Sequence, residues 1–470
     1  MVFSSVTFMF MFLPVVYLLY LILPGTKLKN AILTVGSLLF YAWGEQLYVL
    51  LMIFSVFVNW LFGIAVAKFY TKKNLLVGIS VVLNLGMLFA FKYVGFFAEV
   101  VSLITGLEIP EVSVHLPIGI SFFTFQILSY VIDVGRDKTL VQKNYFNLLL
   151  YISLFPQLIA GPIVKYHDIM NQLDNRKIDL DNVAKGIRRF IIGLSKKLLI
   201  ADAMACVVDE VFAMGTTSMS VYLAWLGAVL YALQIYFDFS GYSDMAIGLG
   251  KMMGFEFKEN FAHPYVSRDI GEFWRRWHIS LSTWFREYLY IPLGGNRKGN
   301  IKTCLNLMIV FLATGLWHGA NFTFVIWGIY NGLLIVLERI GVIPVKKIKN
   351  SFIKRVYTLF AVVIGFTIFR ADSLGYATGY IKTMFSFNGF SIGASDCAEY
   401  LTPYFVLVLL CAFVACCPVT EKVKTLLSSK GKTVMSVAET GSYIFALAML
   451  IVCIMVMASN SYSPFIYFRF

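Results

Sequence analysis

ATGLWHGANFTFVIWG, residues 313–328, lies at the centre of an apolar stretch that extends over Leu305–Leu337 without Asp, Glu, Lys or Arg. A helix needs about 20 mostly apolar residues to cross a bilayer. The stretch therefore predicts two membrane helices, Thr303–Trp317 and Asn321–Leu337, with His318 at their junction. An ionisable side chain at such depth is costly and usually lines an interior cavity or pathway. The stretch thus indicates a polytopic membrane protein with a polar residue in a position suited to function.

The composition of the whole chain supports this class. The chain has 470 residues, of which 59% are hydrophobic and 14% are charged, whereas soluble domains are about 45–50% apolar and about 25% charged. This balance excludes a disordered chain and a small disulfide-rich fold. A net charge of +13 would suggest nucleic acid in a soluble protein. Here the Lys and Arg residues collect in short loops between apolar segments, as in cytoplasmic loops, so no nucleic-acid partner is expected.

Apolar segments recur along the chain and predict an all-α fold with about ten to twelve transmembrane helices, plus re-entrant and interfacial helices. Asn182–Ala201, apolar near one face and basic elsewhere, favours a helix in the membrane interface. The seven cysteines form no C-x-x-C pair, and no metal site is expected. The clearest candidate spans are Val6–Leu23, Ala31–Trp43, Tyr48–Ala67, Leu75–Phe97, Leu116–Val134, Tyr145–Val164, Tyr222–Phe239, Thr303–Trp317, Asn321–Leu337, Val356–Phe369, Tyr404–Cys417 and Tyr443–Met457.

His318 is the first candidate for chemistry. Imidazole takes and returns a proton near neutral pH, and a hydroxyl that attacks a thioester or ester needs such a base. The alternative is a neutral imidazole that only bridges two helices through hydrogen bonds. Gly315 and Gly319 flank it in G-x-x-x-G spacing, which predicts close approach of another backbone. No G-x-S-x-G, P-loop or dinucleotide motif is present in the sequence.

A second histidine, His278, lies in the polar segment EFWRRWHISLSTWFREYLYIPLGGNRKG at 272–299. If this segment is one helix, Trp274, His278 and Phe285 share a face. An aromatic and basic helix of this kind is most simply an interfacial anchor. Alternatively, its arginines hold phosphate groups of a soluble donor. These arginines are Arg275, Arg276 and Arg286.

Two further segments combine polar residues with helix breakers. LQIYFDFSGYSDMAIGLG at 233–250 places Asp238 and Ser240 just after an apolar span. Ser240–Gly241 predicts a break where backbone could line a cavity, and Asp238 is either a buried polar anchor or a group that orients a proton carrier. LFPQLIAGPIVKY at 154–166 predicts a kinked or broken helix because of its two prolines.

Taken together, six segments resemble the membrane-bound O-acyltransferase family, and within it the bacterial alginate O-acetyltransferase-like branch. Each segment alone is a weak signal, but the set covers almost the whole chain. The segments are MVFSSVTFMFMFLPVVYLLY at 1–20, LPIGISFFTFQILSYVIDV at 116–134, LFPQLIAGPIVKY at 154–166, QIYFDFSGYSDMAIGLG at 234–250, FWRRWHISLSTWFREYLYIPLGG at 273–295 and TGLWHGANFTFVIWG at 314–328.

The resemblance implies a fold that encloses a channel across the bilayer, and a reaction. An acyl group, most simply acetyl, passes from a cytoplasmic thioester such as acetyl-CoA to a hydroxyl outside, for polysaccharide O-acetylation. His318 is the implied catalytic base and His278 the second catalytic residue. No bound cofactor is implied. The expected partners are the thioester donor, an extracytoplasmic acceptor or relay protein and the bilayer of a bacterial cytoplasmic membrane. Residues expected along the channel are Asp238, Ser240, Trp317, Asn321, Arg275, Arg276 and Arg286, with Asn321 or backbone near Gly319 as candidates for binding the oxyanion.

Two other functions remain open on the sequence. D-alanyl transfer from a small carrier protein is the alternative within the family. A proton-coupled transporter or flippase is the alternative from another class, because intramembrane His and Asp and broken helices would suit it, although no matched repeats are visible. For the fold that the resemblance implies, we expect one integral-membrane domain over 1–470, with N-terminal helices in 1–104, a catalytic core in 116–340 and C-terminal helices in 341–470.

Overall fold

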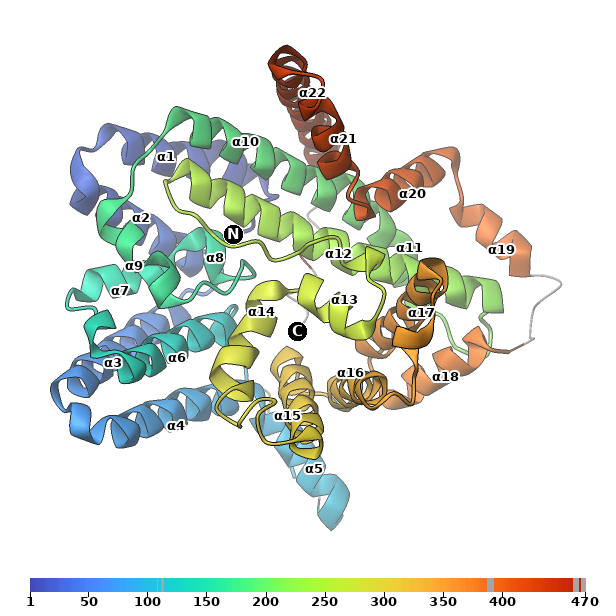
Figure 1. The fold of residues 1–470 in the computed structure, drawn as a ribbon, viewed down its shortest axis with the longest axis horizontal. Coiled ribbons are helices and arrows are strands. Elements are labelled where there is room, and N and C mark those ends of the chain that lie inside the picture. Colours follow the sequence, from blue (N-terminus) through green and yellow to red (C-terminus); the bar gives the residue numbers. More distant parts are fainter. Residues whose placement is uncertain (108, 111–113, 387–392, 460–464, 466–470) are drawn as a thin grey trace. The chain divides into compact units, whose positions relative to one another are not determined.

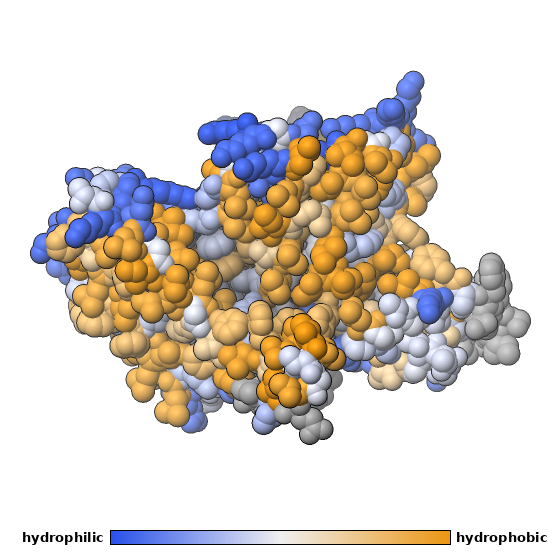
Figure 2. Space-filling model, turned by 90° about the horizontal axis from the view of Figure 1, so that it is seen from below, coloured by the Kyte–Doolittle hydropathy of each residue, from blue (hydrophilic) through white to orange (hydrophobic). Residues whose placement is uncertain are grey.

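The computed structural model describes residues 1–107, 109–110, 114–386, 393–459 and 465. These residues form helices and loops, with no strand among them (Figure 1). Large apolar side chains lie exposed along many of the helices, and they cover much of the surface visible in Figure 2. Such a surface is suited to lipid and not to water. The expected fold class, an all-α polytopic membrane protein, is therefore confirmed.

Seven helices in the described part of the chain are long and apolar enough to cross a membrane. A bent pair, α20 (Pro403–Cys416) and α21 (Val419–Ser428), makes an eighth candidate, with a bend of 61°. The seven are α3 (Tyr48–Lys68), η2 with α4 (Tyr70–Lys92), α12 (Val221–Met252), α15 (Asn300–His318), α16 (Phe322–Ile340), α17 (Ser351–Arg370) and α22 (Lys432–Ser459).

This number is lower than the ten to twelve spans predicted, and the reason is local. The candidate Tyr145–Val164 breaks after α7 (Tyr145–Ser153) into the four-residue helix α8 (Phe155–Leu158), as its prolines predicted. At the start of the chain the apolar helix covers only Phe8–Ile22. Leu116–Val134 forms α6 (Ile120–Arg136), a helix of 17 residues. Apolar segments that are buried among other helices need not match the thickness of a bilayer.

The chain forms two compact units. The first contains Met1–Phe190 and Tyr242–Lys258, and the second contains Ile191–Gly241 and Glu259–Phe470. Two helices, α10 (Leu180–Ser195) and α12, therefore contribute residues to both units. The predicted break at Ser240–Gly241 is absent, because α12 continues through it. Gly241 instead permits a close helix approach, since a Cβ there would lie 2.8 Å from the carbonyl oxygen of Gly193.

The first unit is held together partly by polar contacts between apolar helices. Asn59 on α3 and Asn84 on α4 exchange side-chain hydrogen bonds of 2.8 and 3.1 Å, and Ser80 donates to Asn59 at 2.9 Å. Such bonds stabilise helix pairs that the hydrophobic effect cannot drive together in lipid. The other elements of this unit are η1 (Phe8–Phe12), α1 (Leu13–Ile22), α2 (Gly25–Ala42), α5 (Val94–Thr105), α6, η3 (Lys138–Leu140), α7, α8 and α9 (Tyr166–Asn175).

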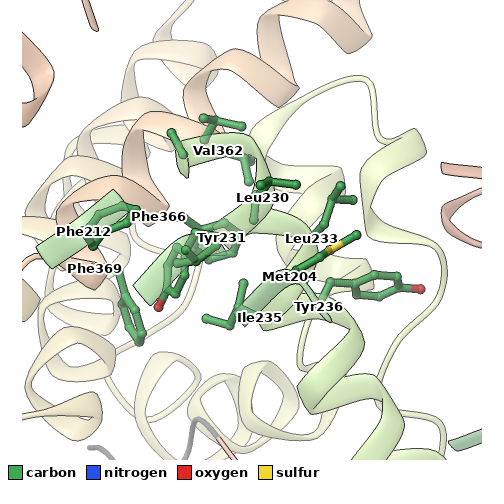
Figure 3. Packing of buried hydrophobic residues seen from close by; sticks show 14 of the residues in the cluster. Met204, Phe212, Leu230, Tyr231, Leu233, Ile235, Tyr236, Val362, Phe366 and Phe369 are labelled. Atoms are coloured by element: carbon green, nitrogen blue, oxygen red, sulfur yellow. The ribbon is translucent and has the colours of Figure 1, made fainter. Parts of the chain in front are cut away.

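The second unit has an aromatic-rich core around the first part of α12. Figure 3 shows Tyr231 of α12 beside Phe212 of α11 and Phe366 of α17, with ring centroids 5.9 and 6.5 Å from that of Tyr231. This core fixes the helices that carry the site described below. The remaining elements are η4 (Lys196–Ala201), α11 (Asp202–Ala213), η5 (Pro264–Val266), α13 (Ile270–Arg276), α14 (Ile279–Phe285), η6 (Arg286–Tyr290), η7 (Val345–Lys347), α18 (Leu374–Met384) and α19 (Gly393–Tyr400).

Helices α15 and α16 form a tight hairpin because glycines line their contact. A Cβ on Gly315 would lie 2.3 Å from the carbonyl oxygen of Phe324, and a Cβ on Gly328 would lie 2.5 Å from that of Phe311. Backbone atoms on both sides leave no flexible side chain that could move aside. The close approach predicted from the glycine spacing is confirmed for Gly315.

We expect Gly315→Ala to destabilise the purified protein by about 1–3 kcal/mol, because the added methyl must push two backbones apart. Thermal unfolding in detergent measures the loss. Gly86→Ala is the matched control, since Gly86 also lies inside an apolar helix but has no atom within 4 Å of its Cβ position. Equal melting temperatures for the two variants would contradict the close contact.

Candidate active site

His278 does not lie within a continuous helix. The segment predicted as one helix is divided into α13 and α14, and Trp277 and His278 lie between them. His278 has a φ of 45°, in the left-handed region that non-glycine residues seldom adopt. The shared face expected for Trp274, His278 and Phe285 is therefore wrong. Such backbone conformations cost about 1–3 kcal/mol and occur preferentially at functional sites.

Asn260, which the sequence analysis did not single out, holds the chain in this conformation. Its side-chain oxygen Oδ1 accepts hydrogen bonds from the backbone N–H of Ser280 at 3.1 Å and from its hydroxyl at 2.9 Å. Its main-chain carbonyl accepts from the N–H of Ile279 at 2.9 Å. Asn260 is fully buried. One residue on the preceding loop thus fixes three consecutive positions, 278–280.

The same contact determines where His278 carries its proton. Nδ1 of His278 lies 3.2 Å from Oδ1 of Asn260. That atom must be the amide oxygen, because the backbone N–H of Ser280 can only donate to it. Nδ1 is then the protonated nitrogen, and Nε2 has the lone pair in the neutral ring. A hydrogen bond to one ring nitrogen fixes the role of the other in this way. His278 is 2% exposed, and Nε2 can act as a proton acceptor in a dry environment.

His318 is the last residue of α15 and is surrounded by aromatic rings. Its imidazole is edge-to-face with Trp327 on α16 and Phe369 on α17, at centroid distances of 5.2 and 5.1 Å. It is 8% exposed. The helix ends here because Gly319 adopts an extended backbone. The ring is therefore held at a helix junction by large rigid side chains, as the sequence predicted for its position between two spans.

Trp317 connects the two histidines. Its ring centroid is 5.0 Å from that of His318 and 6.1 Å from that of His278. On its other side His278 contacts Phe239 of α12, edge-to-face at 4.7 Å. His278 lies outside the seven spanning helices, and its pKa is well below the usual range because burial disfavours the cation and a charge on His318 would repel it. The structure thus brings together His278, Trp317 and His318, all in the second unit.

Asp238 is a buried anchor. Its carboxylate forms an ion pair with Nζ of Lys197 at 2.6 Å. The same nitrogen lies 2.8 Å from the carboxylate of Asp202. Lys197 is 2% exposed and lies in the π-helix η4. The amphipathic pattern of Asn182–Ala201 predicted that its basic residues lie away from the apolar face, but Lys197 of this segment is buried. Because Phe239 follows Asp238 on α12, the ion pair fixes the helix that presents a ring to His278.

The other predicted residues have varied positions. Arg275 and Arg286 are exposed, whereas Arg276 binds Glu272 at 2.9 Å and the carbonyl of Ala262 at 2.9 Å. Arg276 is thereby committed to the local fold. Only Arg275 and Arg286 keep the exposure that binding a soluble donor would require.

Asn321 and Ser240 also take defined places. Asn321 caps α16 by accepting from the N–H of Thr323 at 3.0 Å, and its amide donates to the carbonyl of Asp372 at 3.1 Å. Both ends of its side chain are thus used structurally. Ser240 is buried on α12, and its hydroxyl has no hydrogen-bond partner among the described residues. Within the same residues, no group of three or more His, Cys, Asp or Glu side chains could hold a metal ion.

Several site residues lacked a signal in the sequence. Phe239, Trp327 and Phe369 are apolar residues in apolar helices, so nothing distinguished them from ordinary core. Asn260 lies in the polar segment between α12 and α13, near two aromatic stretches. The one local signal for a role is that an asparagine side chain buried there would need a hydrogen-bond partner. Contacts made across the fold define all four.

An all-helical membrane protein that buries two imidazoles against one tryptophan has two groups that can exchange protons at a site shielded from water. Comparison with known families specifies the class of protein. The family model described as MBOAT, membrane-bound O-acyltransferase, matches residues 37–374. The chain belongs to this family and is a multi-pass membrane O-acyltransferase.

Individual relatives agree with this assignment. The chain is 40% identical to the "Probable alginate O-acetylase AlgI" of Pseudomonas putida, over the full length of both. It is 34% identical to a peptidoglycan O-acetyltransferase of Helicobacter pylori, over 85% of this chain and 83% of the relative. A teichoic acid D-alanyltransferase of Streptococcus thermophilus is 27% identical over 47% of this chain and 56% of the relative's length. The transporter alternative is set aside, and the D-alanyl branch is related over a shorter region.

Proposed function

We propose that this enzyme transfers an acetyl group from acetyl-CoA, or a similar cytoplasmic thioester, to a hydroxyl acceptor on the other side of the membrane. The two buried histidines in contact with Trp317 are the observation that carries the proposal. The full-length similarity to a probable alginate O-acetylase supports an acetyl group and a polysaccharide as final acceptor. A bacterial cytoplasmic membrane is the corresponding location.

His318 acts as the base in the proposed reaction. It removes the proton from the acceptor hydroxyl, whose oxygen then attacks the thioester carbonyl carbon. The carbon–oxygen bond forms, the carbon–sulfur bond breaks, and the thiolate leaves. The imidazolium returns its proton to that thiolate, so the products are the acetyl ester and a free thiol. The surrounding rings exclude water, which protects the thioester from hydrolysis.

His278 has a supporting role in this proposal. With Nδ1 bonded to Asn260, its Nε2 can accept a hydrogen bond from the acceptor hydroxyl or share the proton with His318. A low pKa keeps it neutral, so it does not oppose the positive charge that forms on His318. The final acceptor is a polysaccharide reached directly or through an extracytoplasmic relay protein. The names of the alginate and peptidoglycan O-acetylating relatives support the polysaccharide, whereas the relay protein rests on the family resemblance alone.

The test is a transfer assay with purified protein and acetyl-CoA labelled in the acetyl group. We expect thioester consumption, seen as free thiol and labelled acetate or ester. A parallel reaction contains a D-alanyl thioester on a carrier protein. Consumption of the D-alanyl donor alone would replace the acetyl proposal with the other branch. Stable thioester in both reactions would refute acyl transfer from soluble donors.

The left-handed backbone makes asparagine the informative substitution at position 278. Asn tolerates positive φ better than alanine, so His278→Asn removes the imidazole with little added backbone strain. We expect transfer to fall about 10–100-fold, as for loss of a residue that orients a reacting group, and the protein to remain folded. The rate of labelled acetyl transfer measures the effect.

His263→Asn is the matched control for that variant. Among the residues that the structure describes, His263 is the other non-glycine residue with positive φ, at 48°, and it lies in the same unit outside the proposed machinery. Its substitution tests the same backbone change without the same chemistry. If both variants lose transfer equally, the effect belongs to the backbone and not to the imidazole of His278.

A further inference from the structure

In the first unit, two cationic side chains lie over one tyrosine ring. Nζ of Lys29 is 5.3 Å from the ring centroid of Tyr20, and Cζ of Arg176 is 5.5 Å from it. Nε of Arg176 also donates to the Tyr20 hydroxyl at 2.9 Å. The ring attracts both cations through its negative face. Two like charges are thereby gathered at one place, where they repel each other unless an anion is present.

These three residues line a hollow of about 230 Å³, together with Gly25, Thr26 and Ile178. The volume is many times what one water molecule requires and admits a phosphate group. No lining residue is acidic. In the part of the chain that the structure describes, neither Lys29 nor Arg176 takes part in an ion pair. The positive charge of the hollow is therefore not compensated by these residues.

Arg176 is fixed in its position before any ligand arrives. Its Nη1 donates to the carbonyls of Gln172 and Leu173 at the end of α9, at 3.4 and 3.3 Å. Its guanidinium also lies 4.6 Å from the ring centroid of Phe255. Nη2 is buried and has no hydrogen-bond partner among the described residues. A planar, immobilised guanidinium is well suited to a phosphate.

Backbone groups add to the attraction for an anion. Helix α2 has 18 residues and begins at Gly25, and its N-cap residue Pro24 provides no side-chain cap. The first N–H groups of a helix have no partner within the helix and favour a negative charge. Gly25 and Thr26 from this first turn line the hollow. The helix end acts with the two cations and is not itself the basis of the site.

We propose that this hollow binds a phosphate ester, presented by the headgroup of an anionic phospholipid. Apolar residues next to it favour the lipid over a soluble phosphate, since Ile22 is 75% exposed and Leu28 is 50% exposed. Acyl chains can cover such residues while the headgroup meets Lys29 and Arg176. Basic pockets beside membrane helices bind lipid headgroups in this way. The alternative, soluble ligand with the same phosphate ester chemistry is coenzyme A.

The test uses full-length protein purified in a neutral detergent and stripped of lipid. Phosphatidylglycerol and the zwitterionic phosphatidylcholine are titrated in turn, and bound lipid is counted by native mass spectrometry. Adenosine 3′,5′-bisphosphate is titrated separately by calorimetry as the soluble probe. Lys29→Gln removes one cation without touching Arg176, which supports α9. Lys27→Gln is the matched control, because Lys27 is exposed in the same helical turn and does not line the hollow.

We expect phosphatidylglycerol to bind more tightly than phosphatidylcholine, and Lys29→Gln to weaken it about fivefold, the effect of one basic residue at a membrane surface. Lys27→Gln should leave binding within about twofold. Binding of the bisphosphate that Lys29→Gln weakens would support the site and assign it to the soluble donor. Equal losses in the two variants, or no preference between the lipids together with no bisphosphate binding, would overturn the proposal.

Discussion

His318→Ala is expected to lower acyl transfer by about 10²–10⁴-fold, the usual contribution of a positioned general base, while the protein remains folded in the membrane. The imidazole contacts Trp317, Trp327 and Phe369 through ring edges and faces. Removing it takes away the proposed proton acceptor and leaves the aromatic walls in place. Release of free thiol from acetyl-CoA, measured against time at saturating acceptor, gives the loss directly.

Two controls make that result specific. Donor binding should be unchanged in His318→Ala, because a base that acts on the acceptor hydroxyl contributes little to holding the thioester. His318→Gln, which retains most of the side-chain volume, should be as inactive as the alanine variant if proton transfer is the role of this residue. Turnover near the unmodified rate in either folded variant would remove His318 from the mechanism.

Lys197→Met is expected to have the largest effect on stability. It leaves the buried carboxylate of Asp238 and the partly exposed carboxylate of Asp202 without the cation that now lies 2.6 and 2.8 Å from them. Removing one partner of a buried ion pair costs about 3–5 kcal/mol, because the remaining charge stays in a medium that solvates it poorly. Thermal unfolding in detergent should show a large decrease in the melting temperature. The rate of acyl transfer should fall as well, because Phe239, next to Asp238, contacts His278.

A double variant distinguishes charge from packing at this position. Lys197→Met combined with Asp238→Leu replaces the pair with apolar side chains, and such replacements are often neutral or stabilising. We expect it to be more stable than Lys197→Met alone. Lys196→Met, at the neighbouring position in η4, serves as the control for loss of one positive charge. If it destabilises as much as Lys197→Met, the ion pair with Asp238 does not explain the effect.

Parts of this fold could be read from the sequence because they depend on local composition. The predicted spans Thr303–Trp317 and Asn321–Leu337 correspond to α15 and α16, at 300–318 and 322–340, within three residues at each end. The ends of an apolar stretch without charged residues mark approximately where such helices begin and end. The position of His318 between them follows from the same run. The role proposed for it came from the resemblance to a family and not from the helix pattern.

Other parts depend on contacts between residues far apart in the chain. The pattern around His278 suits a continuous helix, and only the side chain of Asn260, 18 residues earlier, shows why the helix stops there. Lys197 fits the polar face of an amphipathic helix until α12 places Asp238 beside it. Periodicity describes which side of a helix is polar. It does not report whether that side meets water or a carboxylate.

The division of α12 between the two units affects the order in which segments of the chain can fold during synthesis. The first unit is completed by Tyr242–Lys258, where a Cβ on Gly248 would lie 2.7 Å from the carbonyl oxygen of Gly186. These residues emerge only after Ile191–Gly241 of the second unit has been made. The early part of the first unit therefore remains incomplete in the membrane until Tyr242–Lys258 has been synthesised. Such non-local pairing is slow and leaves unpaired helix surfaces exposed in the meantime. Nascent chains released before residue 258 should be preferred targets of membrane proteases.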